Sequence, residues 1–384
     1  MTKQKKKPRR GRGDGSIYWR ADRKRWIAEL PLEDGNIKYF SGKTYVEAQR
    51  ELNQAKLEQQ QGKLATGPKQ TVRQFLEHWL ENVHRPNIRV NSYRIYRQLL
   101  DNHLLPTLGQ YQLQKLSPQH IDELYAQKRR DGFAPETIRA MHRLLRRALQ
   151  DAVRWSLVSS NVCDKVTPPR PVKFESQALS AEQVKQLLAV AKGSQIEVLL
   201  MLALTTGMRV GEMIALRWAD IDFQDGSLQV RHTVSRVGKR FQPNGLIEND
   251  PKTESSRRKI VLPQFVFEAL KRHREQQAEV REKAGEAWQE RDIVFNNYHG
   301  GFLERAHINT VLKRLLKQAG LPEVRIHDLR HSAATILLKM NVNPKQVQVL
   351  LGHSSIVITM DRYSHVMPDM QRTMMDQLDD MFRT

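Results

Sequence analysis

The sequence predicts an α+β protein of several domains: a small module with a three-stranded sheet and one helix, an all-helical domain, and a mainly helical domain with a small antiparallel sheet. The length of 384 residues is enough for roughly two to four domains. Short β-rich runs occur near the N-terminus and again around residue 230, whereas apolar residues elsewhere repeat at helical spacing. A proline-rich segment at 166–175 separates the two halves of the chain.

The charge of the chain favours a polyanionic partner. Lys and Arg number 63 against 42 Asp and Glu, a formal net charge of +21. This charge indicates nucleic acid as the first candidate partner and an acidic membrane surface as the second. The single cysteine, Cys163, excludes an intrachain disulfide framework and a multi-cysteine zinc site, and it fits a reducing compartment. The apolar run Val198–Leu204 has seven residues, far fewer than the ~20 that span a bilayer, so we expect no membrane segment.

Residues 1–13 hold seven Lys or Arg residues and few apolar ones. A segment of this composition cannot bury apolar surface, so we predict a basic flexible arm. The alternative is a solubilising tail. No apolar stretch follows the arm, so the pattern is not that of a secretory signal.

Residues 14–65 are predicted to form a separate module. Three short strands are expected, at Ser16–Arg20, Trp26–Leu30 and Ile37–Phe40. A helix is expected to begin at Thr44, because Glu47 three residues later completes a capping-box pattern. Basic residues stand among the aromatic ones, and a basic strand face fits the major groove of DNA. We therefore predict DNA contacts by Arg20, Arg23, Lys24, Arg25 and Lys38. The alternative is an ordinary solvated face.

Residues 71–165 are predicted to be all-helical. Apolar residues from Phe75 to Val83 recur at helical spacing, and Ser117-Pro118 and Ala134-Pro135 mark later helix starts. The last helix, expected at Thr137–Trp155, carries a row of arginines. We predict that this domain clamps DNA, with contacts by Arg139, Arg143 and Arg147. The alternative is a helical spacer.

Residues 176–384 are predicted to mix helices with a small sheet. A helix is expected after Ser180, a buried helix at Val198–Thr206 that ends at Gly207, and another helix from Arg209 to Trp218. Strands are expected at Ser227–Val234 and Arg258–Leu262. The stretch 236–249 between them is longer than a hairpin needs, and we interpret it as a surface loop.

The sequence lacks the usual signatures of nucleotide binding, zinc proteolysis and α/β-hydrolase chemistry. The last domain instead holds five cationic or imidazole residues and a tyrosine close to predicted element boundaries: Arg209, Lys252, His327, Arg330, His353 and Tyr363. Taken singly, each is a weak signal. His327 and His331 are four residues apart, but no Glu or Cys set accompanies them at ligand spacing, so we predict no metal site.

Five segments of 176–384, taken together and in order, resemble the motifs of a known protein family. They are Thr205-Thr206-Gly207-Met208-Arg209-Val210-Gly211-Glu212, Pro251-Lys252-Thr253, His327-Asp328-Leu329-Arg330-His331, Leu350-Leu351-Gly352-His353 and Asp361-Arg362-Tyr363. In this order they resemble the tyrosine recombinase family, the phage-type site-specific integrases. The resemblance implies that 176–384 is the catalytic domain and 71–165 the domain that binds the core DNA site. By pattern alone, 14–65 is similar to the module that binds arm-type DNA sites in such integrases.

The resemblance implies a covalent reaction on DNA that integrates and excises a phage or mobile element. Tyr363 would attack a phosphodiester, form a 3′-phosphotyrosine and release a 5′-hydroxyl, which a second strand can use for resealing without a nucleotide cofactor. Arg209 and Arg330 suit the oxygens on which negative charge develops, because a guanidinium is permanently charged and donates two parallel hydrogen bonds.

The resemblance assigns the remaining roles to four more residues. Lys252, on the loop of a β-hairpin, would protonate the leaving oxygen, with its pKa lowered by the neighbouring arginines. His327 would accept the tyrosine proton, and His353 would hydrogen-bond the phosphate. Glu212 would orient an arginine or the histidines; the alternative is a charge on a helix face.

We expect no cofactor. The expected partners are double-stranded DNA with core-type and arm-type attachment sites, further copies of the chain in a homotetramer on DNA, and accessory DNA-bending and directionality proteins. The methionine-rich segment 367–384 has helical apolar spacing from Met370 and is expected to dock on a neighbouring protomer; packing on its own domain is the alternative. The expected location is the bacterial cytoplasm, on the nucleoid, with no membrane partner.

Three alternatives stay open at this point. A DNA-binding regulator that reuses the fold is disfavoured because every expected active-site position is filled. A metal-dependent nuclease would need clustered carboxylates, which are not found at convincing spacing. An integration and excision enzyme is favoured over a chromosome-dimer resolvase, because a resolvase of this kind needs only the two downstream domains.

Overall fold

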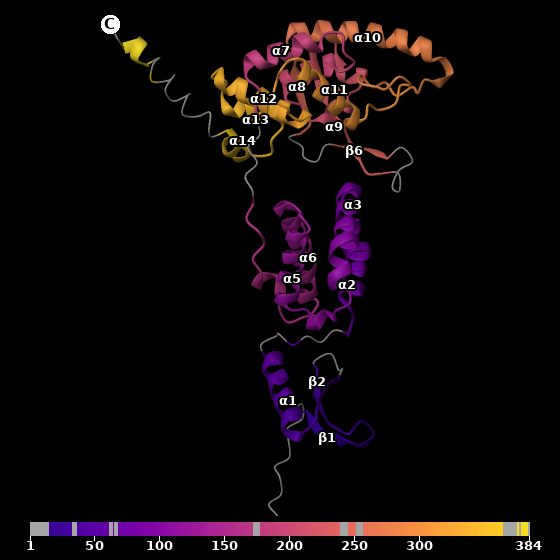
Figure 1. Ribbon diagram of the computed structural model, residues 1–384, viewed down its shortest axis with the longest axis vertical. Coiled ribbons are helices and arrows are strands. Elements are labelled where there is room, and N and C mark those ends of the chain that lie inside the picture. Colours follow the sequence, from indigo (N-terminus) through magenta and orange to yellow (C-terminus); the bar gives the residue numbers. More distant parts are fainter. Residues whose placement is uncertain are drawn as a thin grey trace, which may run out of the picture. The chain divides into compact units, whose positions relative to one another are not determined.

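The computed structural model describes residues 15–32, 37–60, 64, 68–171, 177–238, 245–250, 256–363, 375 and 378–382, with the backbone alone for 361–363. The chain divides into two compact units, Met1–Lys173 and Phe174–Thr384. Helices predominate and the sheets are small and antiparallel, which confirms the predicted α+β class (Figure 1). The basic arm 1–13 lies outside the described residues.

The first unit begins with a three-stranded sheet in the order β1-β2-β3, formed by β1 (Ser16–Arg20), β2 (Arg25–Pro31) and β3 (Ile37–Gly42). Helix α1 (Tyr45–Gln60) covers one face, where Ala28 and Leu30 pack against Leu52. The predicted capping box precedes this helix: the Glu47 N–H donates to Oγ1 of Thr44 (3.2 Å), and the Thr44 N–H donates to the Glu47 carboxylate (3.4 Å). The three strands and the helix are confirmed.

The all-helical part of the first unit contains four α-helices longer than four residues. They are α2 (Val72–His78), α3 (Val90–Leu99), α5 (Pro118–Arg130) and α6 (Pro135–Arg154); α4 (Leu105–Leu108) is a single turn. Two π-helical segments, Trp79–His84 and Leu100–Leu104, continue α2 and α3. The last helix begins two residues earlier than predicted, because Pro135 is favourable at a first helical position. Trp79 is fully buried, and its Nε1 donates to Asp151 on α6 (2.8 Å).

The second unit is built on a bundle of helices around the buried α8 (Figure 1). Its helices are α7 (Ala181–Ala191), α8 (Glu197–Thr206), α9 (Val210–Ile214), α10 (Gln264–Ala284), α11 (Arg305–Gln318), α12 (Ile326–Lys339), α13 (Pro344–Leu351) and α14 (Ile356–Tyr363). Ser180 caps α7 by accepting a hydrogen bond from the Gln183 N–H (3.2 Å), as its sequence pattern predicts. Among the described residues, no helix is both long and apolar enough to span a membrane.

Two small sheets accompany these helices. Strands β4 (Ile221–Asp222), β5 (Ser227–Val230) and β8 (Arg258–Val261) form one sheet in the order β4-β5-β8, while β6 (Thr233–Arg236) pairs with β7 (Leu246–Asn249). The single strand expected at Ser227–Val234 is therefore wrong, since the chain changes sheets at Arg231-His232. The helix expected from Arg209 to Trp218 is also too long, because α9 ends at Ile214.

Two further expectations are modified. The stretch 236–249 is not a loop throughout, because Arg236 ends β6 and the last four residues form β7. The methionine-rich segment lies mostly outside the described residues, but 375 and 378–382 are helical and expose Met381 and Phe382.

Candidate active site

The turn between α8 and α9 is the base of the candidate site. Gly207 ends α8 in a left-handed conformation, with φ 61°, and its N–H donates to the Ala203 carbonyl. A Cβ atom added at Gly207 would lie 2.4 Å from Cδ2 of Leu351. Both the backbone conformation and this contact therefore favour glycine. Arg209 follows as the residue that precedes α9, so the turn places it beside the end of α13.

Arg209 is held by a buried carboxylate. Its Nη1 donates to Oε1 of Glu212 (2.8 Å), and its backbone N–H donates to Oε2 (3.0 Å). Its Nη2 donates to the carbonyl of Gly352 (3.1 Å). The Arg209 side chain remains 37% exposed, whereas that of Glu212 is 3% exposed. The guanidinium is thus fixed from the protein side and still reachable from solvent.

Glu212 also contacts a second arginine, Arg258, whose Nη2 donates to its Oε2 (3.0 Å). Burial alone would raise the pKa of Glu212, but the positive charges of Arg258 and Arg209 outweigh burial and hold that pKa below its usual value of 4.5. The carboxylate is therefore ionised between two guanidinium groups. Glu212 is thus a buried carboxylate paired with two arginines and not a solvated charge on a helix face.

The sequence prediction does not include Arg258. One signal for it is present in the strand 258–261, where burial alternates and Arg258 falls on the same face as the buried Ile260. A charged residue at a core position of a strand needs partners. The sequence does not reveal that the partner is Glu212, far away on α9.

Arg330 lies on α12 and is buried, with 3% of its surface exposed. Its Nη1 donates to the carbonyl of Gly207 (2.6 Å). His327 is half-buried one helical turn earlier, and its ring stands edge-on to that of His331, with centroids 5.4 Å apart. The N-terminus of this helix is fixed by Asp328, which accepts two hydrogen bonds from the Arg325 guanidinium (2.9 Å each).

His353 follows the end of α13 and is buried. Its Nδ1 lies 2.9 Å from Oγ1 of Thr359 on α14, and its carbonyl accepts a hydrogen bond from Nε2 of Gln348 (3.0 Å). The sequence prediction includes neither Thr359 nor Gln348. Each lies within six residues of His353, but their contacts depend on how α13 and α14 fold back on each other.

The side chains of two predicted residues lie outside the described part of the structure. Tyr363 is the last residue of α14, and its side chain lies outside the described part of the structure. Lys252 is outside it altogether, in the connection between β7 and β8. These two strands belong to different sheets, and the position of Lys252 stays a prediction.

The predicted DNA-contacting residues of the small module do not share one surface. Arg20 and Arg25 are paired in register and are exposed on the face opposite α1. Arg23 and Lys24 are exposed in the turn between them. Lys38 is paired with Leu30, whose side chain lies on the α1 face. Because side chains alternate along a strand, the register places Lys38 on that same face, away from Arg20 and Arg25.

The predicted DNA-contacting arginines of α6 lie near its polar surface. Arg143 and Arg147 are exposed, whereas Arg139 is half-buried. Glu136 pairs with both Arg139 (3.4 Å) and Arg143 (3.0 Å), and Nη1 of Arg139 also donates to the Pro169 carbonyl (3.2 Å). Through these contacts Arg139 also stabilises the fold of this unit.

The described residues contain no group of three or more His, Cys, Asp or Glu side chains that could hold a metal ion. Cys163 is buried, and burial raises the pKa of its thiol to about 12, so it is not a nucleophile at neutral pH.

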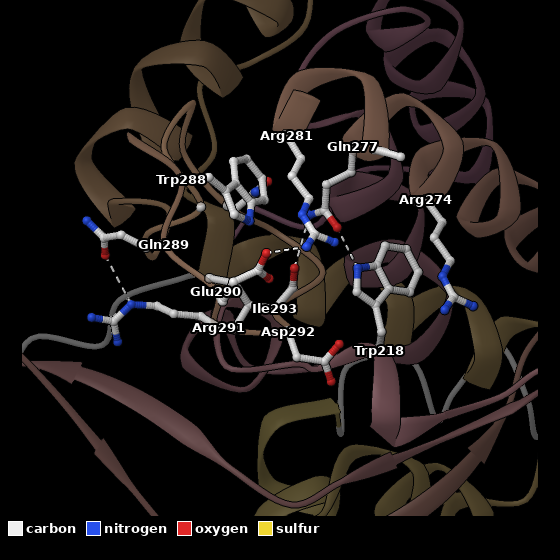
Figure 2. A pocket seen from close by; sticks show the side chains of 13 residues that line it. Trp218, Arg274, Gln277, Arg281, Trp288, Gln289, Glu290, Arg291, Asp292 and Ile293 are labelled. Carbon is white, nitrogen blue, oxygen red and sulfur yellow. Dashed lines mark hydrogen bonds and ion pairs between the residues drawn. The ribbon is translucent and has the colours of Figure 1, made fainter. Parts of the chain in front are cut away.

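A separate pocket lies between α10 and the segment 288–293 (Figure 2). Trp218 Nε1 donates to Gln277 Oε1 (2.6 Å), and Arg281 pairs with Glu290. The amide of Gln277 in turn donates to the Ile293 carbonyl (3.0 Å). These polar groups bind one another, so we assign the pocket to the packing of this segment on α10.

Comparison with protein-family models gives two matches. Residues 177–370 match the phage integrase family, and residues 71–128 match the N-terminal SAM-like domain of phage integrases. Similar proteins include an integrase of Streptomyces ambofaciens, 30% identical over 369 residues that cover 92% of this chain and 93% of that protein. A "Tyrosine recombinase XerC-like" protein of Caldanaerobacter subterraneus subsp. tengcongensis is 29% identical over 366 residues, 91% of this chain and 94% of that protein.

Two solved structures show the same fold. The Tn1549 transposon integrase in complex with transposon right-end DNA superposes with a TM-score of 0.68 at 22% identity, over 81% of this chain and all of that one. A lambda integrase dimer bound to a core site superposes with a TM-score of 0.58 at 18% identity, over 94% of this chain and 96% of that one.

Proposed function

This chain belongs to the phage integrase family of tyrosine recombinases, and from that premise we propose which residues carry out its reaction. It is a tyrosine-type site-specific DNA recombinase, an enzyme that breaks and rejoins DNA strands on behalf of a phage or another mobile element. The roles of individual residues follow from their chemistry and from the geometry of the site.

Tyr363 is the nucleophile in this proposal. Its hydroxyl attacks the scissile phosphodiester, forms a 3′-phosphotyrosine bond and releases a 5′-hydroxyl. His327 takes the proton from the tyrosine, and Lys252 donates a proton to the leaving oxygen. The covalent bond retains the energy of the phosphodiester, so attack by a 5′-hydroxyl of the partner strand reseals the DNA without a nucleotide cofactor.

The observation that carries the proposal is the convergence of two arginines on one turn. Arg330 donates to the Gly207 carbonyl (2.6 Å), and Arg209 stands two residues further along the same turn. Two permanent cations there stabilise the negative charge that develops on the phosphate oxygens. His353 adds a hydrogen bond to the phosphate, and Glu212 orients Arg209. In this scheme no metal ion is needed.

We also propose the DNA sites and the assembly. The helical domain 71–165 binds the core site, and the module 14–65 binds arm-type sites through the face that carries Arg20 and Arg25. Four copies act together on DNA, with the segment 367–384 of one copy docked on the next, and DNA-bending and directionality proteins assist. The net charge of +21 supports a DNA partner, and a lambda integrase tetramer bound to a Holliday junction is a structural neighbour. The place of action is the bacterial cytoplasm, on the nucleoid.

A suicide-substrate assay tests the reaction. Attachment-site DNA with a nick next to the scissile phosphate is incubated with wild type and with Tyr363→Phe, in EDTA. We expect a covalent protein–DNA band with wild type only. Absence of the band on DNA that the protein binds would instead favour a DNA-binding regulator. Cleavage that leaves no covalent band and that EDTA abolishes would favour a metal-dependent nuclease.

A deletion tests the division of DNA sites. Removal of residues 1–62 is expected to leave core-site binding intact and to abolish arm-site binding in gel-shift assays. Equal loss at both sites would contradict the model of two kinds of site.

A further inference from the structure

We propose that Arg258 is a positioning residue of the active site, which fixes Arg209 through Glu212 and joins both to the backbone that precedes His353. This inference rests on the proposed function and deepens it. It adds a residue that contacts neither the phosphate nor the nucleophile in our scheme, and that acts through residues that do.

The position of Arg258 follows from its strand. Arg258 begins β8 and pairs in register with Val230 of β5. Side chains alternate along this strand, so Arg258 and Ile260 are buried while Lys259 and Val261 are exposed. Only 7% of Arg258 is exposed. A guanidinium in such a place must find partners inside the protein.

All three nitrogen atoms of the guanidinium have partners. Nε donates to the Leu350 carbonyl (2.6 Å), Nη1 to the Ser256 carbonyl (3.1 Å), and Nη2 to Oε2 of Glu212 (3.0 Å). Because the fork is planar, three contacts in three directions fix its orientation completely. Arg258 therefore joins three separate segments: the start of β8, helix α9 and the end of α13.

The segments that Arg258 joins carry catalytic groups of the proposed mechanism. On α9, Glu212 accepts hydrogen bonds from both the backbone and the side chain of Arg209. At the end of α13, Arg258 holds the carbonyl of residue 350 while Arg209 holds that of Gly352. The two arginines thus hold two carbonyls, those of residues 350 and 352, within the three residues before His353. A shift of Arg258 would move Arg209 and this backbone together.

The positive charge of Arg258 is a second argument for its positioning role. Glu212 and Arg209 alone would form a neutral pair beside the phosphate. With Arg258 the group holds two positive charges and one negative charge, so a net positive charge faces the DNA. The same excess explains why the pKa of Glu212 is lowered although the residue is buried.

The test measures binding and chemistry separately on the full-length protein. Arg258→Lys keeps the charge but loses the fork, whereas Arg258→Gln keeps hydrogen bonding but loses the charge. Lys259→Met is the matched control, since Lys259 is exposed on the other face of the same strand and pairs with Asp225 (2.5 Å). Thermal unfolding shows which variants are folded, gel shifts give the affinity for core-site DNA, and a suicide substrate at saturating protein gives the single-turnover cleavage rate.

We expect Arg258→Lys to bind DNA within about threefold of wild type and to cleave about tenfold to a hundredfold more slowly, because a small misplacement of a group that stabilises the transition state has effects of this size. Arg258→Gln should be slower than Arg258→Lys, and Lys259→Met should match wild type. Since Arg258 acts through Arg209, combining Arg258→Lys with Arg209→Lys should slow cleavage little beyond Arg209→Lys alone.

Wild-type cleavage rates in folded Arg258 variants, or rate losses that multiply in the double variant, would overturn the proposal. So would unfolding of both Arg258 variants, because the guanidinium would then serve stability. These results leave the proposed function intact as long as wild type forms the covalent adduct. If wild type forms none on DNA that it binds, the proposed function fails, and the positioning role fails with it.

Discussion

Nδ1 of His353 lies 2.9 Å from the hydroxyl oxygen of Thr359. Thr359 is fully buried on α14 and stands one helical turn before Tyr363, the last residue of that helix. The hydrogen bond therefore ties the histidine proposed to bind the phosphate to the helix that carries the proposed nucleophile. It also fixes which way the imidazole ring faces.

Thr359→Val removes this hydroxyl and keeps the shape of the side chain. A neutral hydrogen bond contributes about 1 kcal/mol, so we expect cleavage of a suicide substrate to slow by up to about tenfold, with little change in DNA affinity. Thr359→Ser keeps the hydroxyl and should stay near the wild-type rate. Equal losses in the two variants would mean that the methyl group, and not the hydrogen bond, is important.

Gly207→Ala is expected to destabilise the fold and to displace the Arg330 contact. A non-glycine residue in the left-handed region costs about 1–2 kcal/mol, and the added Cβ would also meet Leu351 at 2.4 Å. Gly320→Ala is the matched control, since its φ of 64° is similar but its added Cβ meets nothing within 4 Å. Urea unfolding should give a larger loss for Gly207→Ala, together with slower cleavage. Equal losses would assign the whole effect to backbone conformation.

The ion pairs of Glu212 predict a dependence of stability on pH. Its pKa is lower in the folded protein than its usual 4.5, so its ionised form stabilises the fold above that pH, and this stabilisation is lost as pH falls through the folded-state pKa. Glu212→Gln should therefore cost about 3 kcal/mol or more at pH 7, where it leaves the buried guanidinium of Arg258 without its anion. In urea unfolding the cost should be smaller at a pH below 4.5. A cost that is the same at both pH values would contradict the ion-pair interpretation.

The register of the N-terminal sheet predicts which basic residues contact DNA. Arg20→Gln and Arg25→Gln should each weaken arm-site binding and reduce the salt dependence of log K by about 0.9, the value for one phosphate contact. Lys38→Gln serves as the comparison, because Lys38 lies on the α1 face. It should leave the salt dependence unchanged. A lower salt dependence for Lys38→Gln would mean that DNA approaches the sheet from the helix side.

Local sequence signals predicted much of the fold. The pattern of Ser180 and Gln183 marks the start of α7, and Gly207 marks the end of α8, because capping and left-handed glycine are properties of a few adjacent residues. The prediction of a single strand at Ser227–Val234 was wrong because strand pairing depends on residues that are distant in the sequence. β propensity continues through Arg231-His232, but pairing with β8 on one side and β7 on the other splits the run into two strands.

The residues of the candidate site also differ in whether local sequence signals could predict them. The residues proposed to have direct chemical roles belong to short motifs, so they could be proposed from the sequence. Arg258 could not, because its importance depends on Glu212, and the two meet only when β8 packs against α9. The sequence also could not predict on which face of the sheet Lys38 lies. Alternation along a strand gives two faces but does not say which of them a helix will cover.

A second glycine lies close to Arg209. A Cβ at Gly211 would lie 2.6 Å from the Val234 carbonyl oxygen and 2.8 Å from Oγ1 of Thr233, so β6 rests directly on the backbone of α9. Gly207 and Gly211 therefore flank Arg209 with two positions that the fold itself restricts to glycine. A relative that had lost the reaction would still lose stability if either glycine were replaced. Their presence in a homologue is evidence of architecture, and only the arginine between them is evidence of catalysis.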